Sequence, residues 1–371
     1  MDSTSIKSLL EKRRAANSFR ELRHANPNLI DFSSNDYLGL AQNDSLKAQI
    51  LEHYQQHRGK NGATGSRLLT GNTASIEDCE AYLANHFNST AATLFSSGYM
   101  ANLAFFSSVP QKGDIVFYDE LSHACIKDGL RLSFAKRIPF KHNDLQDLER
   151  KLTENKAEGQ AYIACESIYS MDGDLAPLAE ITTLATTYNA LIVVDEAHST
   201  GSWGENGSGL VNELGLRDSV YAVIYTFGKA MGIHGACVTG TKLLKDFFVN
   251  FARPFIYTTA PSAFEVSAIT SAFEYLKRHP SLPLNLSSKS TLFNQLLPNA
   301  ASPSAIKSFA IGGNEATKEA ANTLQMKGFD VRPILSPTVK EGSERLRICL
   351  HAFNLEEEIE QLARALQIFL P

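Results

Sequence analysis

Two short segments of the chain combine an apolar stretch with residues that can do acid–base or covalent chemistry. In LIVVDEAHSTG, four apolar residues precede Asp195, and His198 follows three positions later. In VIYTFGKAMGIHG, Thr226 and Lys229 follow another apolar stretch, and glycines stand at positions 228, 232 and 235. The apolar residues of each segment predict a buried strand. Because ligands of open α/β sheets bind just outside the carboxyl ends of strands, we expect both segments to face one crevice.

The pair formed by Asp195 and Lys229 suits a pyridine-based cofactor. A carboxylate beside the ring nitrogen keeps that nitrogen protonated, and the ring can then absorb the electrons of a carbanion. A lysine amine can form an imine with the cofactor and later transfer a proton. Taken alone, a buried aspartate at a strand end is more often structural, and a lysine next to glycine is usually a loop residue. The two together, each after an apolar strand, indicate a pyridoxal phosphate (PLP) enzyme.

Residues 195 to 198 also spell DEAH, the motif of a helicase class. Such an enzyme needs G-x-x-x-x-G-K-[ST] to hold its phosphates, and neither Gly-Lys pair of this chain, at 59–60 and 228–229, is followed by Ser or Thr. The formal net charge of −5 also lacks the basic excess typical of nucleic-acid binding. We therefore expect small-molecule partners and no nucleic acid.

Length and composition indicate the number of domains and the cellular compartment. A chain of 371 residues with 43% hydrophobic side chains can build a full core, and two domains are expected. Its five scattered cysteines form no C-x-x-C pair, which predicts a reducing compartment and no metal site. The first residues are charged, and no run of 18 apolar residues occurs, so we expect a cytoplasmic protein without membrane contact.

Between residues 75 and 240, short β-branched runs alternate with helical patterns. This alternation predicts an α/β fold with a mostly parallel central sheet and helices on both of its faces. The clearest helical patterns cover 75–87, with Ser75 as the expected N-cap, and 177–188. The expected strands are 93–96, 114–118, 161–165, 191–194, 221–225 and 236–239.

The last quarter of the chain has a different pattern. Pro, Ser and Asn are frequent over 278–303, which predicts an irregular boundary segment. After it we expect a helix near 315–327, strands near 329–335 and 345–350, and a final helix over 355–369. These elements predict a smaller α+β domain.

With these segments in view, the chain resembles the α-oxoamine synthase family of fold-type I PLP enzymes. The matching stretches run from Asp31 to the C-terminus and are DFSSNDYLGLA, GATGSRLLTGN, LFSSGYMAN, DELSHACIKDGLRL, ESIYSMDGDLAPL, VVDEAHSTG, YTFGKAMGIHGA and ERLRI. The resemblance implies a large PLP-binding domain over 46–277 and a small domain over 278–371. It also implies that residues 1–45 form a segment packed with the small domain.

The resemblance implies a role for each residue around the cofactor. Lys229 would form the Schiff base, Asp195 would pair with the pyridinium nitrogen, His198 would bond the phenolic oxygen, and His123 would stack on the ring and meet substrate. The positions that match further cofactor contacts are Gly98 and Tyr99 at the phosphate, Ser170 and Thr226 as hydroxyl donors, and Thr258 and Thr259 at the phosphate of a neighbouring subunit. A homodimer with shared sites follows from the last two.

Four further positions match substrate contacts of the family. Arg347 would grip the carboxylate of the amino acid, a role that suits a planar two-pronged donor, and Asn35 would assist it. Arg20 matches a residue that meets the far end of the acyl chain, and Thr338 matches another substrate contact. Without the resemblance, Arg347 would be interpreted as a strand residue in a surface ion pair.

The reaction implied is a decarboxylative condensation of an amino acid with an acyl thioester. The GATGSRLLTGN stretch favours the branch that joins L-alanine to a pimeloyl group, carried by CoA or by an acyl carrier protein, in biotin biosynthesis. The alternatives within the family are 2-amino-3-ketobutyrate-CoA ligase and other enzymes that use glycine or serine. An alternative of another class is a non-catalytic PLP-binding partner of a true synthase.

Overall fold

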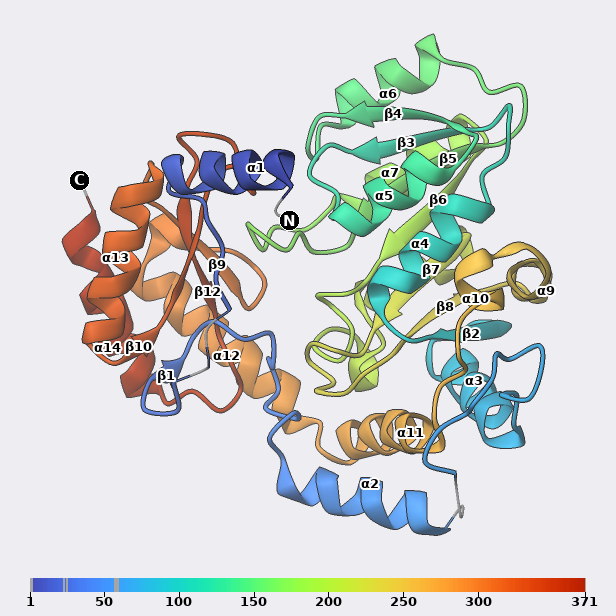
Figure 1. Cartoon of the computed structure of the whole chain (residues 1–371), viewed down its shortest axis with the longest axis horizontal. Coiled ribbons are helices and arrows are strands. Elements are labelled where there is room, and N and C mark those ends of the chain that lie inside the picture. The colour runs from blue at the N-terminus through green and yellow to red at the C-terminus, as the bar shows by residue number, and fades with distance from the viewer. Residues whose placement is uncertain (1–2, 23, 25, 57–59, 371) are drawn as a thin grey trace. The chain divides into compact units, whose positions relative to one another are not determined.

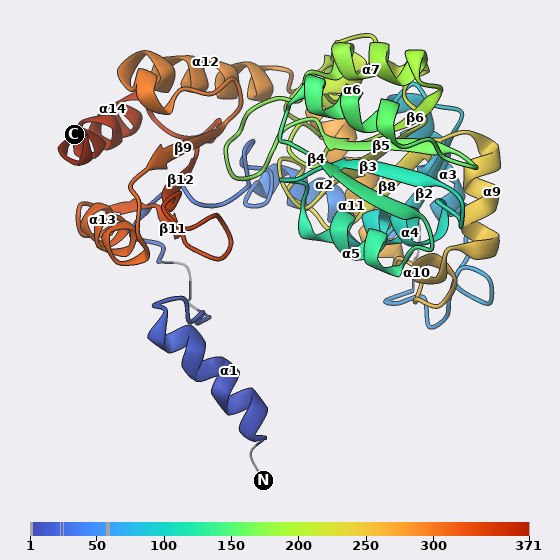
Figure 2. The same ribbon diagram turned by 90° about the horizontal axis from the view of Figure 1, so that it is seen from above.

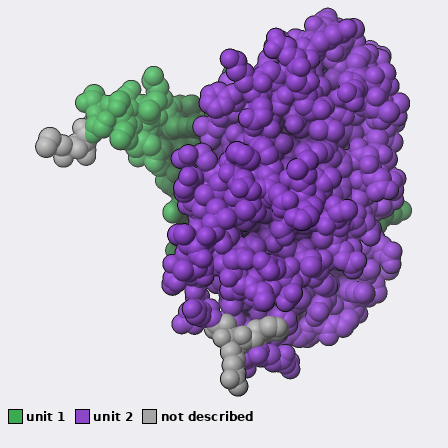
Figure 3. Space-filling view, turned by 90° about the vertical axis from the view of Figure 1, so that its right-hand side faces the viewer, with its two compact units in different colours: residues 1–35, 171–173, 285–371 green, residues 36–170, 174–284 purple. Residues whose placement is uncertain are grey.

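The computed structural model describes residues 3–22, 24, 26–56 and 60–370, and the chain divides into two compact units (Figure 3). Unit 1 comprises residues 1–35, 171–173 and 285–371, and unit 2 comprises residues 36–170 and 174–284. The expected boundaries at 45 and 277 differ from these limits. Residues 36–45 belong to unit 2 because Leu40 is buried there and Asn43 Nδ2 donates to Tyr275 Oη at 3.1 Å.

A seven-stranded sheet forms the centre of unit 2. Its strand order is β2-β8-β7-β6-β5-β3-β4, and every strand is parallel to the others except β8, which is antiparallel to both of its neighbours. The strands are β2 (Ala91–Phe95), β3 (Ile115–Asp119), β4 (Lys136–Phe140), β5 (Ala161–Glu166), β6 (Ala190–Asp195), β7 (Ala222–Thr226) and β8 (Ala236–Gly240). The mostly parallel sheet predicted from the sequence is therefore confirmed.

Strand β4 is one element that the sequence pattern did not predict. It lies at the end of the sheet, and only Ile138 and Phe140 of its residues are buried. Its sequence, KRIPF, carries two cations and a proline, residues that are typical of an edge strand but weaken an apolar strand signal.

Helices cover both faces of this sheet, as expected. Figure 2 shows α4 and α5 below the strands and α6 and α7 above them. The helices of unit 2 are α2 (Asp44–Gln56), α3 (Ala74–His86), α4 (Gly98–Ser108), α5 (Ala124–Leu132), α6 (Leu145–Glu154), α7 (Leu178–Thr187), α8 (Leu210–Glu213), α9 (Lys242–Phe251), α10 (Arg253–Ile256) and α11 (Ala263–Arg278). Helix α3 begins at Ala74, so that Thr73 rather than Ser75, two residues later, is its N-cap.

Unit 1 is an α+β unit. Strand β12 (Arg345–Cys349) pairs antiparallel with β11 (Arg332–Ile334) and β9 (Ile306–Ala310), and β1 (Ile30–Asp31) pairs parallel with β10 (Phe329–Asp330). Helices α13 (Asn314–Met326) and α14 (Glu356–Leu366) agree with the expected pattern. Helix α1 (Thr4–Ala15), labelled in Figure 1, has no buried residue among its side chains.

The predicted irregular segment over 278–303 is wrong, because residues 281–296 form helix α12 (Ser281–Leu296). Its proline, Pro283, lies in the first turn, where backbone N–H groups have no partner within the helix and a proline is tolerated. The buried residues Leu286, Ser290 and Phe293 then recur at helical spacing.

Within the described ranges, none of the helices combines the length and the apolar character that crossing a membrane requires.

Candidate functional site

The carboxyl ends of β6 and β7 bring the two chemical segments side by side. The strands are parallel neighbours, and Asp195 at the end of β6 pairs in register with Ile224, two residues before the end of β7. Lys229 follows β7 by three residues. Groups from both segments therefore lie at this edge of the sheet, as expected.

Lys229 and His198 contact each other directly. Lys229 Nζ lies 2.7 Å from His198 Nε2, and the other ring nitrogen, Nδ1, lies 2.7 Å from the hydroxyl of Tyr37. His198 is 6% exposed and Tyr37 is 1% exposed, so the contact between them is shielded from water, whereas Lys229 is half-buried. Because both ring nitrogens have partners, the orientation of the imidazole is fixed beside the lysine amine.

Asp195 is a buried carboxylate held from two sides. Its Oδ2 accepts from Asn102 Nδ2 at 2.7 Å, and its Oδ1 accepts from the backbone N–H of Ala197 at 2.9 Å. The side chain is 4% exposed. Two donors compensate part of the cost of burying a carboxylate, and a cationic partner such as a protonated ring nitrogen would compensate the rest.

His123 begins helix α5 and is anchored by a second buried acid. Its backbone N–H donates to Glu166 Oε1 at 2.5 Å, and its Nδ1 accepts from the N–H of Cys125 at 3.3 Å. Burial lowers the pKa of His123, Lys229 lowers it further and Asp195 opposes both. Burial and the nearby Asp195 raise the pKa of Glu166 to about 8. A neutral imidazole at this position is suited to stacking rather than to ion pairing.

The N-terminus of α4 has the properties of a phosphate site. Among the described residues, Thr226 Oγ1 is buried and has no hydrogen-bond partner. A Cβ atom added to Gly98 would lie 2.1 Å from that oxygen, so only glycine fits at the start of α4. The backbone N–H groups and dipole at a helix N-terminus favour an anion. An orphaned hydroxyl beside such a terminus fits the phosphate of PLP.

The other predicted cofactor contacts, Tyr99, Ser170, Thr258 and Thr259, lie in unit 2 and are at least partly exposed. The Tyr99 hydroxyl donates to the Asp128 carboxylate, and this bond raises the pKa of Tyr99. Ser170 is half-buried in the loop after β5. Thr258 is half-buried and Thr259 exposed in the loop after α10. The cofactor roles of these four residues stay predictions.

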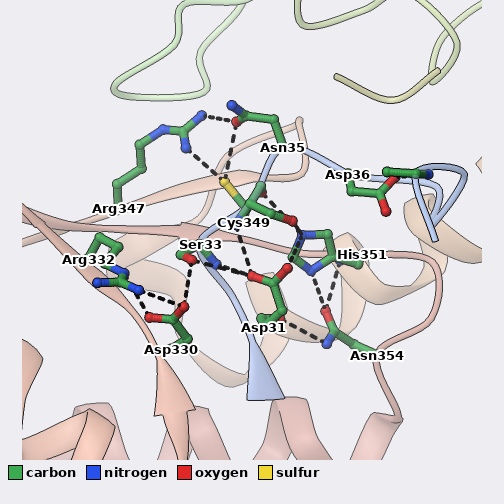
Figure 4. Close-up of polar contacts among 12 residues, drawn as sticks. Asp31, Ser33, Asn35, Asp36, Asp330, Arg332, Arg347, Cys349, His351 and Asn354 are labelled. Carbon is green, nitrogen blue, oxygen red and sulfur yellow. Dashed lines mark hydrogen bonds and ion pairs between the residues drawn. The ribbon is translucent and has the colours of Figure 1, made fainter. Parts of the chain in front are cut away.

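The predicted substrate residues form two pairs within unit 1. Arg347 Nη2 donates to Asn35 Oδ1 at 2.9 Å, and Arg347 Nη1 lies 2.9 Å from Cys349 Sγ (Figure 4). Arg20 Nη2 donates to Thr338 Oγ1 at 3.0 Å. Residues that lie 312 and 318 positions apart in sequence are thus brought together, and their substrate roles stay predictions.

Sequence reasoning missed three residues that hold the predicted ones. Tyr37 positions His198, Asn102 holds Asp195, and Glu166 anchors the start of α5. Each lies inside a stretch that carried the resemblance, namely SSNDYLGL, SSGYMAN and ESIYSMDGD. The signal was therefore present, but the pairing of each residue with its partner depends on the fold.

Comparisons with known sequences identify the family of the chain. Residues 27–366 match the family described as aminotransferase class I and II. An 8-amino-7-oxononanoate synthase of Emericella nidulans is 36% identical over 394 residues, covering 99% of this chain and 95% of that protein. An enzyme of the same name from Lysinibacillus sphaericus is 37% identical, covering 89% of this chain and 86% of that protein.

Solved structures show the same fold. A serine palmitoyltransferase of Sphingomonas wittichii superposes with a TM-score of 0.90 at 27% identity, covering 98% of this chain and 97% of that one. A serine palmitoyltransferase of S. paucimobilis with a bound PLP–myriocin aldimine gives 0.88 at 26% identity, covering 98% and 96%. These likenesses confirm the predicted fold class, that of fold-type I PLP transferases. The chain belongs to the aminotransferase class I and II family.

Proposed function

We propose that this enzyme uses PLP to condense L-alanine with a pimeloyl thioester, forming 8-amino-7-oxononanoate for biotin biosynthesis. A bond forms between alanine Cα and the pimeloyl carbonyl carbon, while the thiol of CoA or of a carrier protein leaves and the alanine carboxyl group departs as CO2. The observation that carries the proposal is the joint presence of Lys229, His198 and Asp195 at one sheet edge in a chain similar to synthases of that name over nearly its full length.

The chain supplies three functions around the cofactor. When bound, PLP provides an electron sink for the electrons released as the Cα–H bond of alanine breaks. Lys229 Nζ takes that proton and later returns one, with His198 Nε2 2.7 Å away to orient the amine. Asp195 keeps the ring nitrogen protonated, and the Asn102 amide holds the carboxylate in place. The hydroxyl of Thr226 and the first turn of α4 bind the phosphate.

The substrates are held by the residues of unit 1. Arg347 and Asn35 bind the alanine carboxylate, and Arg20 with Thr338 meets the distal carboxylate of the pimeloyl chain.

Ser170 and Tyr99 complete the cofactor contacts. The five cysteines are free and buried, which supports a reducing compartment and hence the cytoplasm.

A second function has an observation in its favour. The structural likeness to serine palmitoyltransferases, with TM-scores of 0.88 to 0.90, favours an enzyme that joins serine to a long acyl chain. A solved 8-amino-7-oxononanoate synthase of Francisella tularensis gives 0.79 at 28% identity. The named synthases that are 36–37% identical over 89–99% of this chain support the alanine reaction.

A product-mass assay over a matrix of substrates tests the proposal. Alanine, glycine and serine are each combined with pimeloyl, heptanoyl and palmitoyl thioesters. We expect alanine with the pimeloyl thioester to be the preferred pair, and Arg20→Ala to erase most of the preference for pimeloyl over heptanoyl. A lost charge-assisted hydrogen bond corresponds to a decrease of about 10- to 150-fold. Preference for serine and a palmitoyl thioester would assign the second function instead.

A further inference from the structure

A polar cluster in unit 1 lies next to the Asn35–Arg347 pair, below it in the view of Figure 4. Its members are Asp31 at the end of β1, the Ser33–Ser34 turn, and the His351 and Asn354 side chains of the loop after β12. His351 is 0% exposed and Asn354 is 2% exposed, although both are polar. Such residues persist in a core when their hydrogen bonds are satisfied. Asn354 bonds the carbonyl of Asp31, and His351 contacts Ser34, so both residues reach the segment that leads to Asn35.

Backbone bonds first set the register of this turn against Arg347. Phe32 is fully buried, and its carbonyl accepts from the N–H of Cys349 at 2.8 Å. Its own N–H donates to the carbonyl of Asp330 at 3.2 Å. The position of Phe32 is therefore fixed on two sides. It lies three residues before Asn35 and beside Cys349, the last residue of β12, which also contains Arg347.

Asp31 then shapes the turn itself. Its Oδ1 accepts from the N–H groups of Ser33 at 2.8 Å and of Ser34 at 2.9 Å. Burial would raise the pKa of Asp31, but hydrogen bonds from Ser34 outweigh it and hold the pKa below its usual value. An ionised carboxylate that binds two consecutive N–H groups folds the chain sharply, as in an Asx-turn.

His351 and Asn354 close the turn from the other side. Asn354 Oδ1 accepts from the N–H of His351 at 2.9 Å, and its Nδ2 donates to the carbonyl of Asp31 at 3.2 Å, which fixes the orientation of the amide. Because this Oδ1 only accepts, the His351 Nδ1 at 3.2 Å carries a proton. His351 Nε2 then faces Ser34 Oγ at 3.1 Å and the Ser34 carbonyl at 3.2 Å.

We propose that Asp31, His351 and Asn354 are positioning residues that hold the turn at residues 33–35 and so aim the Asn35 amide at Arg347. Their function is to set the affinity for the amino-acid carboxylate. The proposal rests on the proposed function, in which Arg347 and Asn35 bind that carboxylate. It predicts a selective defect, because the cluster has bonds to the turn but does not take part in the bond-making steps.

Two variants disrupt the hydrogen bonds of the cluster, one at His351 and one at Asn354. His351→Phe retains a ring that can stack on Phe353, whose centroid is 4.6 Å away, but lacks both nitrogens. Asn354→Ala removes the amide that joins His351 to Asp31. In the holoenzyme we expect each to weaken the binding of L-alanine, measured by calorimetry, by about 5- to 30-fold. We expect kcat at saturating alanine and the KM for the acyl thioester to change less than about twofold.

Reference variants separate this inference from the proposed function and from simple loss of stability. Asn35→Ala combined with either variant should bind alanine no more weakly than Asn35→Ala alone, since all act through the same amide. Leu362→Ala, a fully buried residue of α14, is the control that lowers the melting temperature but leaves alanine affinity unchanged.

The outcomes are distinct. If Arg347→Ala weakens alanine binding while His351→Phe and Asn354→Ala do not, or if their effects add to that of Asn35→Ala, the positioning role is wrong and the proposed function stands. If Arg347→Ala itself leaves alanine binding unchanged, the carboxylate grip is wrong and the positioning role falls with it. A selective, non-additive loss of alanine affinity supports the positioning role.

Discussion

At the scale of single residues, the side chains that follow β6 and β7 are held by specific hydrogen bonds. Asp195 has two hydrogen-bond donors, Asn102 Nδ2 and the N–H of Ala197, and Lys229 has His198 within 2.7 Å. None of these contacts is exposed enough for surface screening to weaken it strongly. Substitutions here should therefore have effects far larger than those of the same substitutions at the surface.

Asp195→Asn tests the partner of the ring nitrogen. An amide retains the shape of the side chain and one of its two accepting oxygens, but it cannot keep a pyridine nitrogen protonated. We expect turnover to fall by about 10²- to 10³-fold, the range seen when a preorganised electrostatic contact is removed. Steady-state kinetics measures the loss. Asp246→Asn, at an exposed ion pair with Lys242, is the control, and equal small effects of both would refute the assignment.

Gly98→Ala tests the phosphate end of the site. The added Cβ would lie 2.1 Å from Thr226 Oγ1, so either the threonine or the first turn of α4 must shift. We expect the affinity for PLP to decrease by about tenfold or more, the loss of roughly one charge-assisted hydrogen bond. Equilibrium dialysis measures it. Gly62→Ala adds a Cβ that has no atom of the described residues within 4 Å, and it should leave PLP affinity unchanged.

At the scale of elements, a histidine joins three loops of unit 2. His142 Nδ1 lies 3.0 Å from Asp119 Oδ1 at the end of β3, and its Nε2 lies 2.8 Å from Asp174 Oδ2 beyond the Ser170 loop. Burial opposes protonation, but the hydrogen bonds to both aspartates outweigh it and raise the pKa of His142 to about 10. The imidazolium therefore links these loops as a fixed cation at neutral pH.

His142→Gln should remove a pH-dependent part of the free energy of unfolding. Because the folded-state pKa is raised, this contribution is fully present below pH 6.5 and is lost as the pH rises through about 10. We expect the variant to be less stable by up to a few kcal/mol near pH 6.5, and the difference to shrink towards pH 10.

Urea unfolding of both proteins across that range measures this difference. His279→Gln, at a histidine that bonds the Tyr275 carbonyl, is the control. A difference between wild type and His142→Gln that stays constant with pH would contradict the cation.

The same scale shows what sequence patterns could and could not predict. The strands that end at Asp195 and Thr226 were predictable because buried parallel strands are continuous apolar runs. Helix α12 was missed because the Pro and Ser content of 281–296 obscured the helical spacing of Leu286, Ser290 and Phe293. Strand β4 was missed because an edge strand needs fewer apolar residues.

Residue roles follow a similar division. Lys229 and Asp195 were predictable because their chemistry is written in a local motif, whereas the Asn102–Asp195 bond joins positions 93 residues apart. The buried Lys307 of β9 is a second residue whose contacts could not be predicted from the sequence. Of its three bonds, those to Ser290 and Asn294 depend on helix α12, which the composition concealed, and the third is to the Ser302 carbonyl.

At the scale of the whole molecule, we expect a homodimer in which Thr258 or Thr259 serves the phosphate of the other subunit. A Lys229→Ala chain and a chain changed to alanine at both threonines should each be inactive alone. Mixed dimers would contain one intact site, so random exchange of subunits should restore about a quarter of wild-type activity. Sedimentation measures the oligomeric state, and activity after mixing measures the recovery. A monomer, or no recovery despite exchange, would contradict the shared site.

The central claim is that Lys229 Nζ carries the cofactor, and covalent trapping tests it most directly. The holoenzyme is reduced with borohydride, digested, and its peptides are weighed by mass spectrometry. We predict that the mass of reduced cofactor appears on the peptide containing Lys229. We also predict that it is absent from Lys229→Ala, whose circular dichroism is unchanged, and retained in the surface control Lys242→Ala. Cofactor trapped on another lysine, or trapped equally by Lys229→Ala, would contradict the claim.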